Sequence, residues 1–318
     1  MYYIGIDLGG TNIAAGVVNE KYEILAKGSV PTGRLRPYEE IIGDMASLCK
    51  RLIKQAGLTE KDIEAIGFAS PGTPIVEDGC FTGTENIPSF FGTPVVDELK
   101  KYFPDKKIYI ENDANAAAYG ESLAGAARGE KDVVMITLGT GIGGGIIIDG
   151  KVYAGFNHAG AELGHIIIER DGVPCSCGRR GCWEAYASVT ALIRQTEEII
   201  KEYPDSIIHE MLKKEGARIT GRTSFEAMQK GDKAGRVIVE QYIKNIATGV
   251  ISMISVFQPK KFIIGGGISR EGETILAPLR EHVINAYPKE PIPRPEIVQA
   301  ELGGDAGIVG AAMICKQL

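Results

Sequence analysis

Short apolar runs, separated by glycine-rich or polar turns, open the chain, and their lengths distinguish strands from helices. Apolar runs of about four to eight residues between turn residues are typical of strands. After Pro37, apolar residues recur at the spacing of one helix face. The pattern predicts strands over residues 2–7, 13–18 and 24–30 joined as a meander, a helix that includes residues 41–52, and a buried strand over 63–69.

The same pattern begins again at residue 133. The segment DLGGTNIAAGVVNEKYEI from Asp7 and the segment TLGTGIGGGIIIDGKVYA from Thr137 share a first turn rich in glycine and threonine, followed by a strand of small residues. An internal duplication explains this similarity. Strands are predicted over 133–138, 143–148, 151–153, 261–264 and 296–300, and helices over 189–202, 234–256, 274–286 and from 306. We therefore expect an α/β protein built of two similar halves.

Two of the turns contain enough glycine to approach a ligand. Residues 139–144 match the dinucleotide fingerprint GxGxxG, but a strand follows where that fingerprint requires a helix, so we reject a Rossmann site. Neither turn is a Walker loop. Each offers backbone N–H groups and a threonine hydroxyl, Thr11 or Thr140, and such turns can cradle phosphate. A third run, from Gly265 to Gly267, lies between a predicted strand and helix, where a nucleotide can also approach.

Composition narrows the class of protein. The 318 residues are 44% hydrophobic and can bury a substantial core. The net charge is −6, and basic residues are interspersed with acidic ones, which argues against a nucleic-acid partner. The sequence has neither a signal segment nor a run of about 20 apolar residues. We therefore expect a cytoplasmic protein with no membrane partner.

Three of the six cysteines, Cys175, Cys177 and Cys182, lie close together. The alternatives are a disulfide, a redox pair and a metal site. Cysteines separated by one residue close too small a ring for a relaxed disulfide, and a redox pair normally has the spacing Cys-x-x-Cys. In a reducing compartment such clusters are more often metal ligands. A zinc site needs four nitrogen or sulfur ligands, so the cluster is one ligand short.

Two aspartates lie at the ends of predicted strands. Asp113 lies between a strand over 107–110 and a helix over 114–127. An aspartate there is either the helix N-cap or a base that takes a hydroxyl proton during phosphoryl transfer. Asp7 lies beside the first glycine turn, where a carboxylate either stabilises the turn or positions Mg²⁺, directly or through water.

Several motifs together resemble the sugar kinases of the ROK family. They are Asp-Leu-Gly-Gly-Thr at 7–11, Glu-Asn-Asp-Ala-Asn at 111–115, the glycine turn at 138–145, Glu-Leu-Gly-His at 162–165 and Cys-x-Cys-Gly-x-x-Gly-Cys-x-Glu at 175–184. The resemblance implies a duplicated actin-like ATPase fold, which is ribonuclease H-like, with two lobes around a cleft that binds ATP and Mg²⁺. The expected N-terminal lobe is 1–118, with a helix over 304–318 returning to it, and the expected C-terminal lobe is 119–303 with the metal loop.

The resemblance also implies roles for single residues. Asp113 is expected to be the general base, and Asn112 is expected to hold a sugar hydroxyl. The other residues expected at the sugar are Gly72, Asn86, Glu162, His165 and Glu184. The residues expected at ATP are Asp7, Gly9, Gly10, Thr11, Asn12, Gly139, Thr140, Gly141, Gly265 and Gly266.

His165 can complete the cysteine cluster. It precedes Cys175 by ten residues, so one loop can bring His165, Cys175, Cys177 and Cys182 around a tetrahedral ion. Four protein ligands leave no open position, so the predicted Zn²⁺ is structural. Zinc on one ring nitrogen leaves the other N–H free, and in the family this N–H meets the sugar.

The expected activity is transfer of the γ-phosphoryl group of ATP to the 6-hydroxyl of an aldohexose, a reaction of glycolysis. Glucose is the expected acceptor, and N-acetylmannosamine, N-acetylglucosamine and fructose are alternatives. Two departures from the family concern the sugar: Ala-Gly-Ala-Glu at 159–162 replaces Ala-Gly-Glu, and residues 84–89 lack a Gly-Trp pair.

Two rival functions remain. Sugar-responsive transcriptional regulators of the family carry a DNA-binding segment ahead of the kinase-like fold, whereas the first strand here begins at Tyr2. An inactive sugar sensor would not need Asp113 and both glycine turns intact.

We expect a homodimer or homotetramer.

Overall fold

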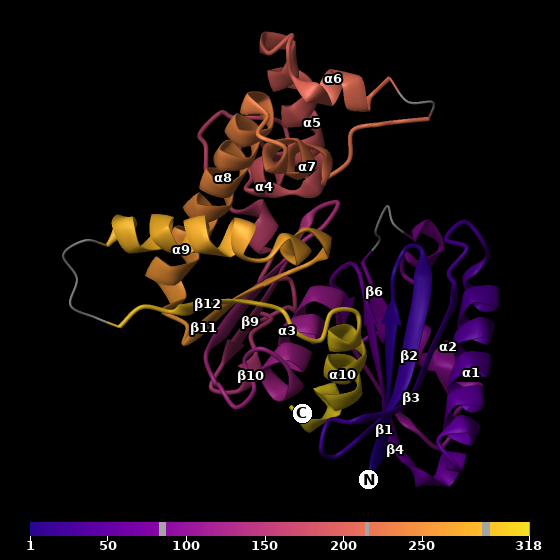
Figure 1. Cartoon of the computed structure of the whole chain (residues 1–318). Helices are drawn as coiled ribbons and strands as arrows, with labels where there is room; N and C mark the ends of the chain where they lie inside the picture. The colour runs from indigo at the N-terminus through magenta and orange to yellow at the C-terminus, as the bar shows by residue number, and fades with distance from the viewer. Residues whose placement is uncertain (83–86, 214–215, 288–292, 318) are drawn as a thin grey trace. The chain divides into compact units, whose positions relative to one another are not determined.

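The computed structural model describes residues 1–82, 87–213, 216–287 and 293–317, and Figure 1 shows the path of the chain. The first sheet has five strands in the order β3-β2-β1-β4-β7. They are β1 (Tyr2–Leu8), β2 (Asn12–Asn19), β3 (Ile24–Pro31), β4 (Ile63–Ser70) and β7 (Lys107–Asn112). Strand β2 pairs antiparallel with both β1 and β3, and β4 pairs parallel with both β1 and β7. The predicted meander is therefore confirmed.

The second sheet repeats the strand order of the first, as β10-β9-β8-β11-β12. It consists of β8 (Val133–Leu138), β9 (Ile142–Ile148), β10 (Lys151–Val152), β11 (Lys261–Gly265) and β12 (Glu296–Gln299). In both sheets the third strand along the chain lies at one edge, and the second, first, fourth and fifth follow. This common order confirms the internal duplication. A separate hairpin pairs β5 (Pro74–Ile75) with β6 (Cys80–Phe81).

Helix α1 (Tyr38–Gln55) follows the predicted apolar spacing, with Pro37 at its N-cap position. Its buried residues include Met45, Leu48 and Leu52, and it packs against β2 and β3. The other helices are α2 (Val95–Lys100), α3 (Asp113–Ala124), α4 (Glu184–Ala187), α5 (Val189–Ile199), α6 (Ile207–Met211), α7 (Thr223–Gln229), α8 (Lys233–Phe257), α9 (Glu273–Ala286) and α10 (Asp305–Met313). The sequence pattern did not predict the short helices α2, α4, α6 and α7.

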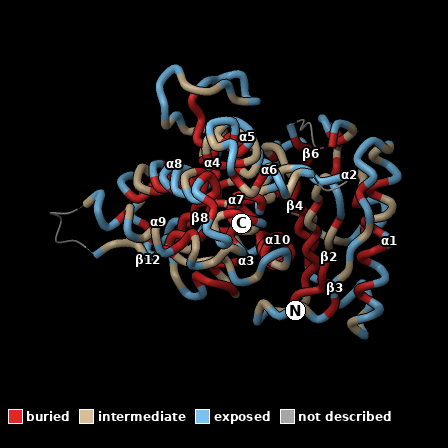
Figure 2. The backbone as a smooth tube through the Cα atoms, turned by 45° about the horizontal axis from the view of Figure 1, so that its top comes forward, coloured by how far each residue is buried: buried red, intermediate tan, exposed pale blue. Residues whose placement is uncertain are grey.

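The C-terminal helix α10 packs against β1, β4 and α3, and Figure 2 shows it in the colour of buried residues. Glycines in the sheet allow this approach. A Cβ atom on Gly5 would overlap the Ile308 carbonyl oxygen, and one on Gly67 would overlap the Ala311 carbonyl oxygen. Only a residue without a side chain lets two backbones come this close.

The residues group into two compact units. Unit 1 comprises residues 1–133, 145–161 and 301–318, and unit 2 comprises residues 134–144 and 162–300. All of α3 belongs to unit 1. The lobes predicted from the sequence instead divide the chain at 118/119, within this helix, and at 303/304. That division stays a prediction.

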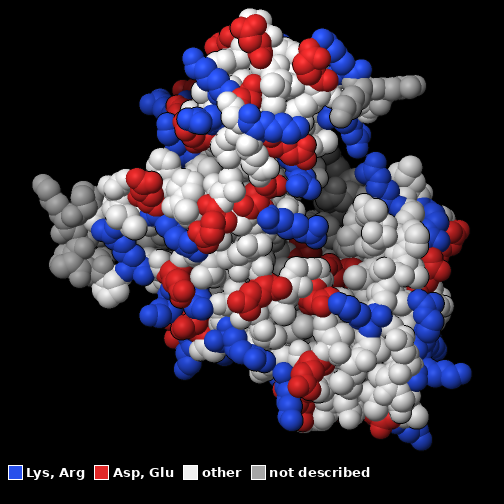
Figure 3. All heavy atoms as spheres, viewed as in Figure 1, with Lys and Arg blue, Asp and Glu red and all other residues white. Residues whose placement is uncertain are grey.

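Two observations concern the surface. Within the described ranges, no helix combines the length and the apolar character needed to cross a membrane. On the face shown in Figure 3, basic and acidic side chains are interspersed.

Candidate active site

The first glycine turn follows β1 in unit 1. The Gly9 N–H donates to the Asn12 carbonyl (3.0 Å), which closes the turn. Thr32, at the end of β3, holds it through two bonds: its hydroxyl donates to the Gly9 carbonyl (2.6 Å), and its N–H donates to the Thr11 carbonyl (2.9 Å). The side chains of Thr11 and Asn12 are exposed. The hydroxyl and amide predicted to meet ATP are therefore accessible.

Two carboxylates of unit 1, Asp7 and Asp113, are close enough for their charges to interact. Burial raises the pKa of Asp7 to about 7, and the negative charge of Asp113 contributes to the rise. Helix α10 contributes to this burial, because a Cβ atom on Gly307 would overlap the Asp7 carboxylate. A divalent cation would relieve the repulsion, and carboxylate oxygen is a ligand that Mg²⁺ prefers.

The N-cap of α3 is Asn112 rather than Asp113. The Asn112 Oδ1 accepts from the N–H groups of Ala114 (2.9 Å) and Asn115 (3.2 Å). Asp113 is the first residue of the helix, and its Oδ1 accepts from the Ala114 N–H (2.8 Å). The N-cap interpretation of Asp113 is therefore wrong, because the preceding residue performs the capping.

Gly72 and Glu111 hold Asn112 in place. The Asn112 Nδ2 donates to the Gly72 carbonyl (3.2 Å), and Gly72 has a φ of 95°, which favours glycine. The Glu111 carboxylate is only 5% exposed and accepts from the Asn112 N–H (2.9 Å) and the Asn115 Nδ2 (3.0 Å). Burial raises the pKa of Glu111, although these hydrogen bonds oppose the rise.

Sequence reasoning missed Glu111, although one signal was present: a charged residue near the end of a buried strand. Asn86, expected at the sugar, lies outside the described residues.

The second glycine turn, between β8 and β9 in unit 2, is held by Glu184. The Gly139 N–H donates to the Gly141 carbonyl (3.0 Å), and the Ile142 N–H donates to the Glu184 Oε2 (2.8 Å). A Cβ atom on Gly141 would overlap the same carboxylate. The other oxygen, Oε1, accepts from the Ser176 hydroxyl (3.5 Å). Glu184 thus joins the turn to the segment that contains Cys175, Cys177 and Cys182.

The third glycine run follows β11. Gly266 has a φ of 85°, and a Cβ atom there would overlap the backbone of Leu138. Packing against β8 already requires glycine at this position, and the nucleotide role of Gly265 and Gly266 stays a prediction. Gly139 is different, because a Cβ atom there would meet no atom within 4 Å. The exposed side chain of Thr140 lies in the same turn.

The structure brings together the four predicted metal ligands. One donor atom each from His165, Cys175, Cys177 and Cys182 lies within 4.8 Å of every other. The Cys175 Sγ is 3.6 Å from the His165 Nδ1, and the Cys177 Sγ is 3.6 Å from the Cys182 Sγ. Three thiol sulfurs and an imidazole nitrogen form a donor set that suits Zn²⁺. The His165 Nδ1 is the ring nitrogen beside the Cys175 sulfur, so Nε2 is the ring nitrogen that remains for another partner.

The metal loop, residues 162–184, is anchored to α8. Trp183 is fully buried, and its indole N–H donates to the Asn245 carbonyl (2.8 Å). The Tyr186 hydroxyl accepts from the Val173 N–H (2.7 Å). At the start of the loop, Glu162 is exposed.

Comparison with known proteins gives concordant matches. The sequence profile of the ROK family matches residues 3–318. The glucokinase of Thermotoga maritima is 39% identical over 317 residues, covering 99% of this chain and 97% of that protein. An N-acetyl-D-glucosamine kinase of Vibrio atlanticus is 30% identical, covering 99% of each chain. The crystal structure of a ROK family glucokinase from Streptomyces griseus, in complex with glucose and AMPPNP, has a TM-score of 0.81 and 35% identity and covers 100% of each chain.

Proposed function

The chain belongs to the ROK family, and we infer that it is a glucokinase, which transfers the γ-phosphoryl group of ATP to the 6-hydroxyl of glucose. The observation that carries the inference is full-length similarity to ROK glucokinases, one of them solved with glucose and AMPPNP. The intact Asp113 and glycine turns support it.

We assign the general base to Asp113. As the glucose hydroxyl oxygen attacks the γ-phosphorus, its proton passes to the Asp113 carboxylate and ADP leaves. Because Asn112 caps α3, the helix start does not depend on Asp113 as its N-cap. We assign Asn112 and Gly72 to one side of the sugar, since the hydrogen bond between them fixes both.

We assign nucleotide binding to the glycine turns and Mg²⁺ to Asp7. Thr11, Asn12 and Thr140 are exposed at the turns, and Gly139 leaves its backbone open to a phosphate. Mg²⁺ bound near Asp7, directly or through water, would neutralise charge on the transferring phosphoryl group.

We assign a structural Zn²⁺ to His165, Cys175, Cys177 and Cys182. The ion would fix the imidazole ring through Nδ1, so that the Nε2 N–H can donate to a sugar hydroxyl. Glu162 and Glu184 would accept hydrogen bonds from further hydroxyls. The substrates are those of the cytoplasm, where we place the enzyme, and we expect a homodimer or homotetramer.

A coupled assay with ATP tests the activity. Glucose should give the highest kcat/KM in a panel with N-acetylglucosamine, N-acetylmannosamine and fructose. The relative from Vibrio atlanticus makes N-acetylglucosamine the second candidate. A higher kcat/KM for N-acetylglucosamine than for glucose would reassign the acceptor, and no turnover of any of the four would refute the kinase.

A further inference from the structure

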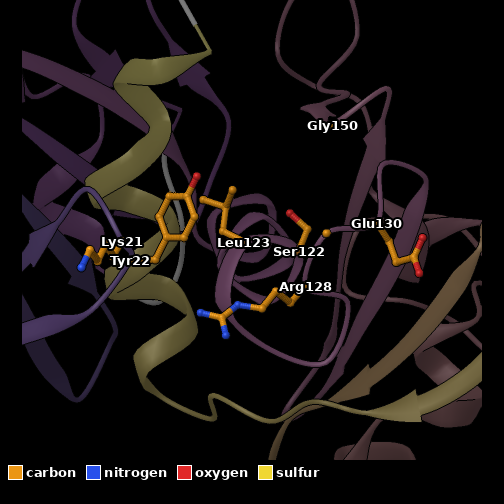
Figure 4. A pocket seen from close by; sticks show the side chains of 8 residues that line it. Lys21, Tyr22, Ser122, Leu123, Arg128, Glu130 and Gly150 are labelled. Carbon is orange, nitrogen blue, oxygen red and sulfur yellow. The ribbon is translucent and has the colours of Figure 1, made fainter.

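A cavity of about 360 Å³ lies in unit 1 and is lined by residues from three segments of the chain. Figure 4 shows that its Lys21 and Glu130 side chains point away from each other. The Ser122 hydroxyl donates to the Tyr119 carbonyl (2.8 Å), and the Gly129 N–H donates to the Ser122 carbonyl (3.2 Å). Because these polar groups are already paired, this cavity carries no proposal.

The start of helix α5 holds two carbonyl groups of the second glycine turn. The Val189 N–H donates to the Gly139 carbonyl (2.9 Å), and the Thr190 hydroxyl donates to the Thr140 carbonyl (2.8 Å). Val189 and Thr190 are the first two residues of α5. The N–H groups in the first turn of a helix have no acceptor within that helix, so the Val189 N–H can serve the glycine turn.

These two hydrogen bonds also fix the direction of two N–H groups. A trans peptide is planar, and its N–H and its carbonyl point in opposite directions. No cis peptide bond occurs among the described residues. The Gly139 carbonyl shares a peptide with the Thr140 N–H, and the Thr140 carbonyl shares a peptide with the Gly141 N–H. Because both carbonyls are directed to α5, both N–H groups point away from it.

The N–H groups of Thr140 and Gly141 are the part of the turn that is left for a ligand. In the part of the chain that the structure describes, neither of them donates to a protein acceptor. Thr140 is exposed and Gly141 is half-buried. Successive backbone N–H groups that point the same way form a concave site for an anion. The phosphate groups of a nucleotide are such anions.

The first glycine turn is held by the same kind of contact. The Thr32 hydroxyl donates to the Gly9 carbonyl (2.6 Å), and the Thr32 N–H donates to the Thr11 carbonyl (2.9 Å). In each half of the chain, a threonine hydroxyl and a backbone N–H from outside the turn therefore hold two of its carbonyls. Thr32 directly follows β3, whereas Thr190 belongs to α5, so the duplication does not account for this likeness. A shared task of the two turns accounts for it.

We propose that Thr190 is a positioning residue for the phosphate groups of the nucleotide. Its hydroxyl holds the Thr140 carbonyl and thereby aims the Gly141 N–H at a phosphate oxygen. The Val189 N–H does the same for the Thr140 N–H through the Gly139 carbonyl. Thr190 acts through the peptide that it holds, and not by contact with the nucleotide. This inference rests on the proposed function and names the groups that hold the phosphates in unit 2.

Thr190→Val tests this role, because valine keeps the branched shape of the side chain and removes the hydroxyl. AMPPNP affinity, measured by calorimetry, should fall about tenfold, because the Gly141 N–H is no longer held in place. Adenosine has no phosphate and should bind the variant and the wild type equally. Thr190→Ser keeps the hydroxyl and should restore most of the AMPPNP affinity. Thr248→Val is the control, because the exposed Thr248 hydroxyl donates to the Lys244 carbonyl within α8.

Amide proton resonances provide a second measurement, and the wild type alone suffices for its first part. AMPPNP should shift the Thr140 and Gly141 amide protons downfield, because a hydrogen bond to phosphate deshields them, and adenosine should not. Thr190→Val should lose the Gly141 shift and keep the Thr140 shift, which depends on Val189.

Three outcomes would refute the positioning role and leave the kinase intact. They are equal AMPPNP affinity in Thr190→Val and Thr248→Val, an equal loss of AMPPNP and adenosine affinity in Thr190→Val, and an active wild type in which AMPPNP shifts neither amide proton. The second outcome would mean that the hydroxyl merely stabilises the fold. A wild type that neither binds AMPPNP nor phosphorylates glucose would refute the proposed function, and this inference with it.

Discussion

The two glycine turns occupy equivalent places in the duplicated halves, but different residues hold them. The first follows Asp7, and Thr32, the residue after strand β3, holds it by two hydrogen bonds. In the second turn, Thr137 occupies the position equivalent to Asp7. The carboxylate that holds this turn belongs to Glu184 in the metal loop and accepts from the Ile142 N–H. The strand order was kept in both halves, while the charged groups diverged.

This difference assigns distinct tasks to the turns. The first half carries an interacting carboxylate pair, Asp7 and Asp113, with a pKa of about 7 for Asp7. Such a pair suits proton transfer and cation binding. The second turn shares Glu184 with the metal loop, so its geometry should depend on that loop.

The largest effect is expected at Asp113. Asp113→Asn keeps the shape of the side chain but removes proton acceptance, so kcat should fall by about 10²–10⁴ while glucose affinity largely persists. Thr137→Val, in the second half, should leave kcat nearly unchanged. Steady-state kinetics of both variants provide the test. Near-normal kcat in Asp113→Asn, or an equal loss in Thr137→Val, would show that the chemistry is not confined to the first half.

The sequence predicted the sheets well because buried strands are short apolar runs that end at glycine turns. The predicted strand over 133–138 coincides with β8. Helices α2 and α6 have 6 and 5 residues, too few for an apolar period to appear. The clustering of His165, Cys175, Cys177 and Cys182 was also predictable, since a single loop contains all four residues.

The partners of the site residues were not predictable. Glu184 and Ile142 are 42 residues apart, and only the folded chain brings the carboxylate to the amide. Asn112 and Asp113 are neighbours that both suit an N-cap, so the sequence alone could not decide which one performs it. The role of Glu111 also depends on burial, which its charge argued against.

The next largest effect concerns Asp7 and pH. The folded protein keeps the Asp7 proton up to about pH 7, whereas the unfolded chain releases it near the ordinary value of 3.8. Between these pH values the unfolded state binds fewer protons, so the free energy of unfolding falls as pH rises. Asp7→Asn removes this contribution. Urea unfolding in Mg²⁺-free buffer should show the variant gaining up to about 3 kcal/mol over the wild type between pH 5 and pH 8.

Glu111 also has a raised pKa, but it is present in both proteins, so the difference between the two curves isolates Asp7. Asp171→Asn, at an exposed position, should follow the wild type. Parallel curves for Asp7→Asn and the wild type would mean that Asp7 is already charged in the folded state.

A smaller effect is expected from loss of the metal. We expect metal analysis to find about one zinc per chain in the wild type, and Cys177→Ala should lose it. Glucose affinity should fall by about 10–100-fold, because His165 and Glu184 lose their fixed positions. AMPPNP affinity should fall too, by a smaller factor, through the bond from Glu184 to the second turn. Separate calorimetric titrations distinguish the ligands, and Cys315→Ala is the control. A zinc-free wild type with full activity would refute the site.

The smallest effect is expected within the second turn, where two glycines should respond differently. A Cβ atom on Gly139 meets no protein atom within 4 Å, so Gly139→Ala can obstruct only an approaching ligand. AMPPNP affinity should fall roughly tenfold, with glucose affinity unchanged. A Cβ atom on Gly141 displaces the Glu184 carboxylate, so Gly141→Ala should weaken glucose and AMPPNP together. Calorimetry on folded protein compares the pair. Equal effects of the two variants on glucose would show that Glu184 does not link this turn to the sugar, and the contrast between the two turns would then rest on Asp7 and Asp113 alone.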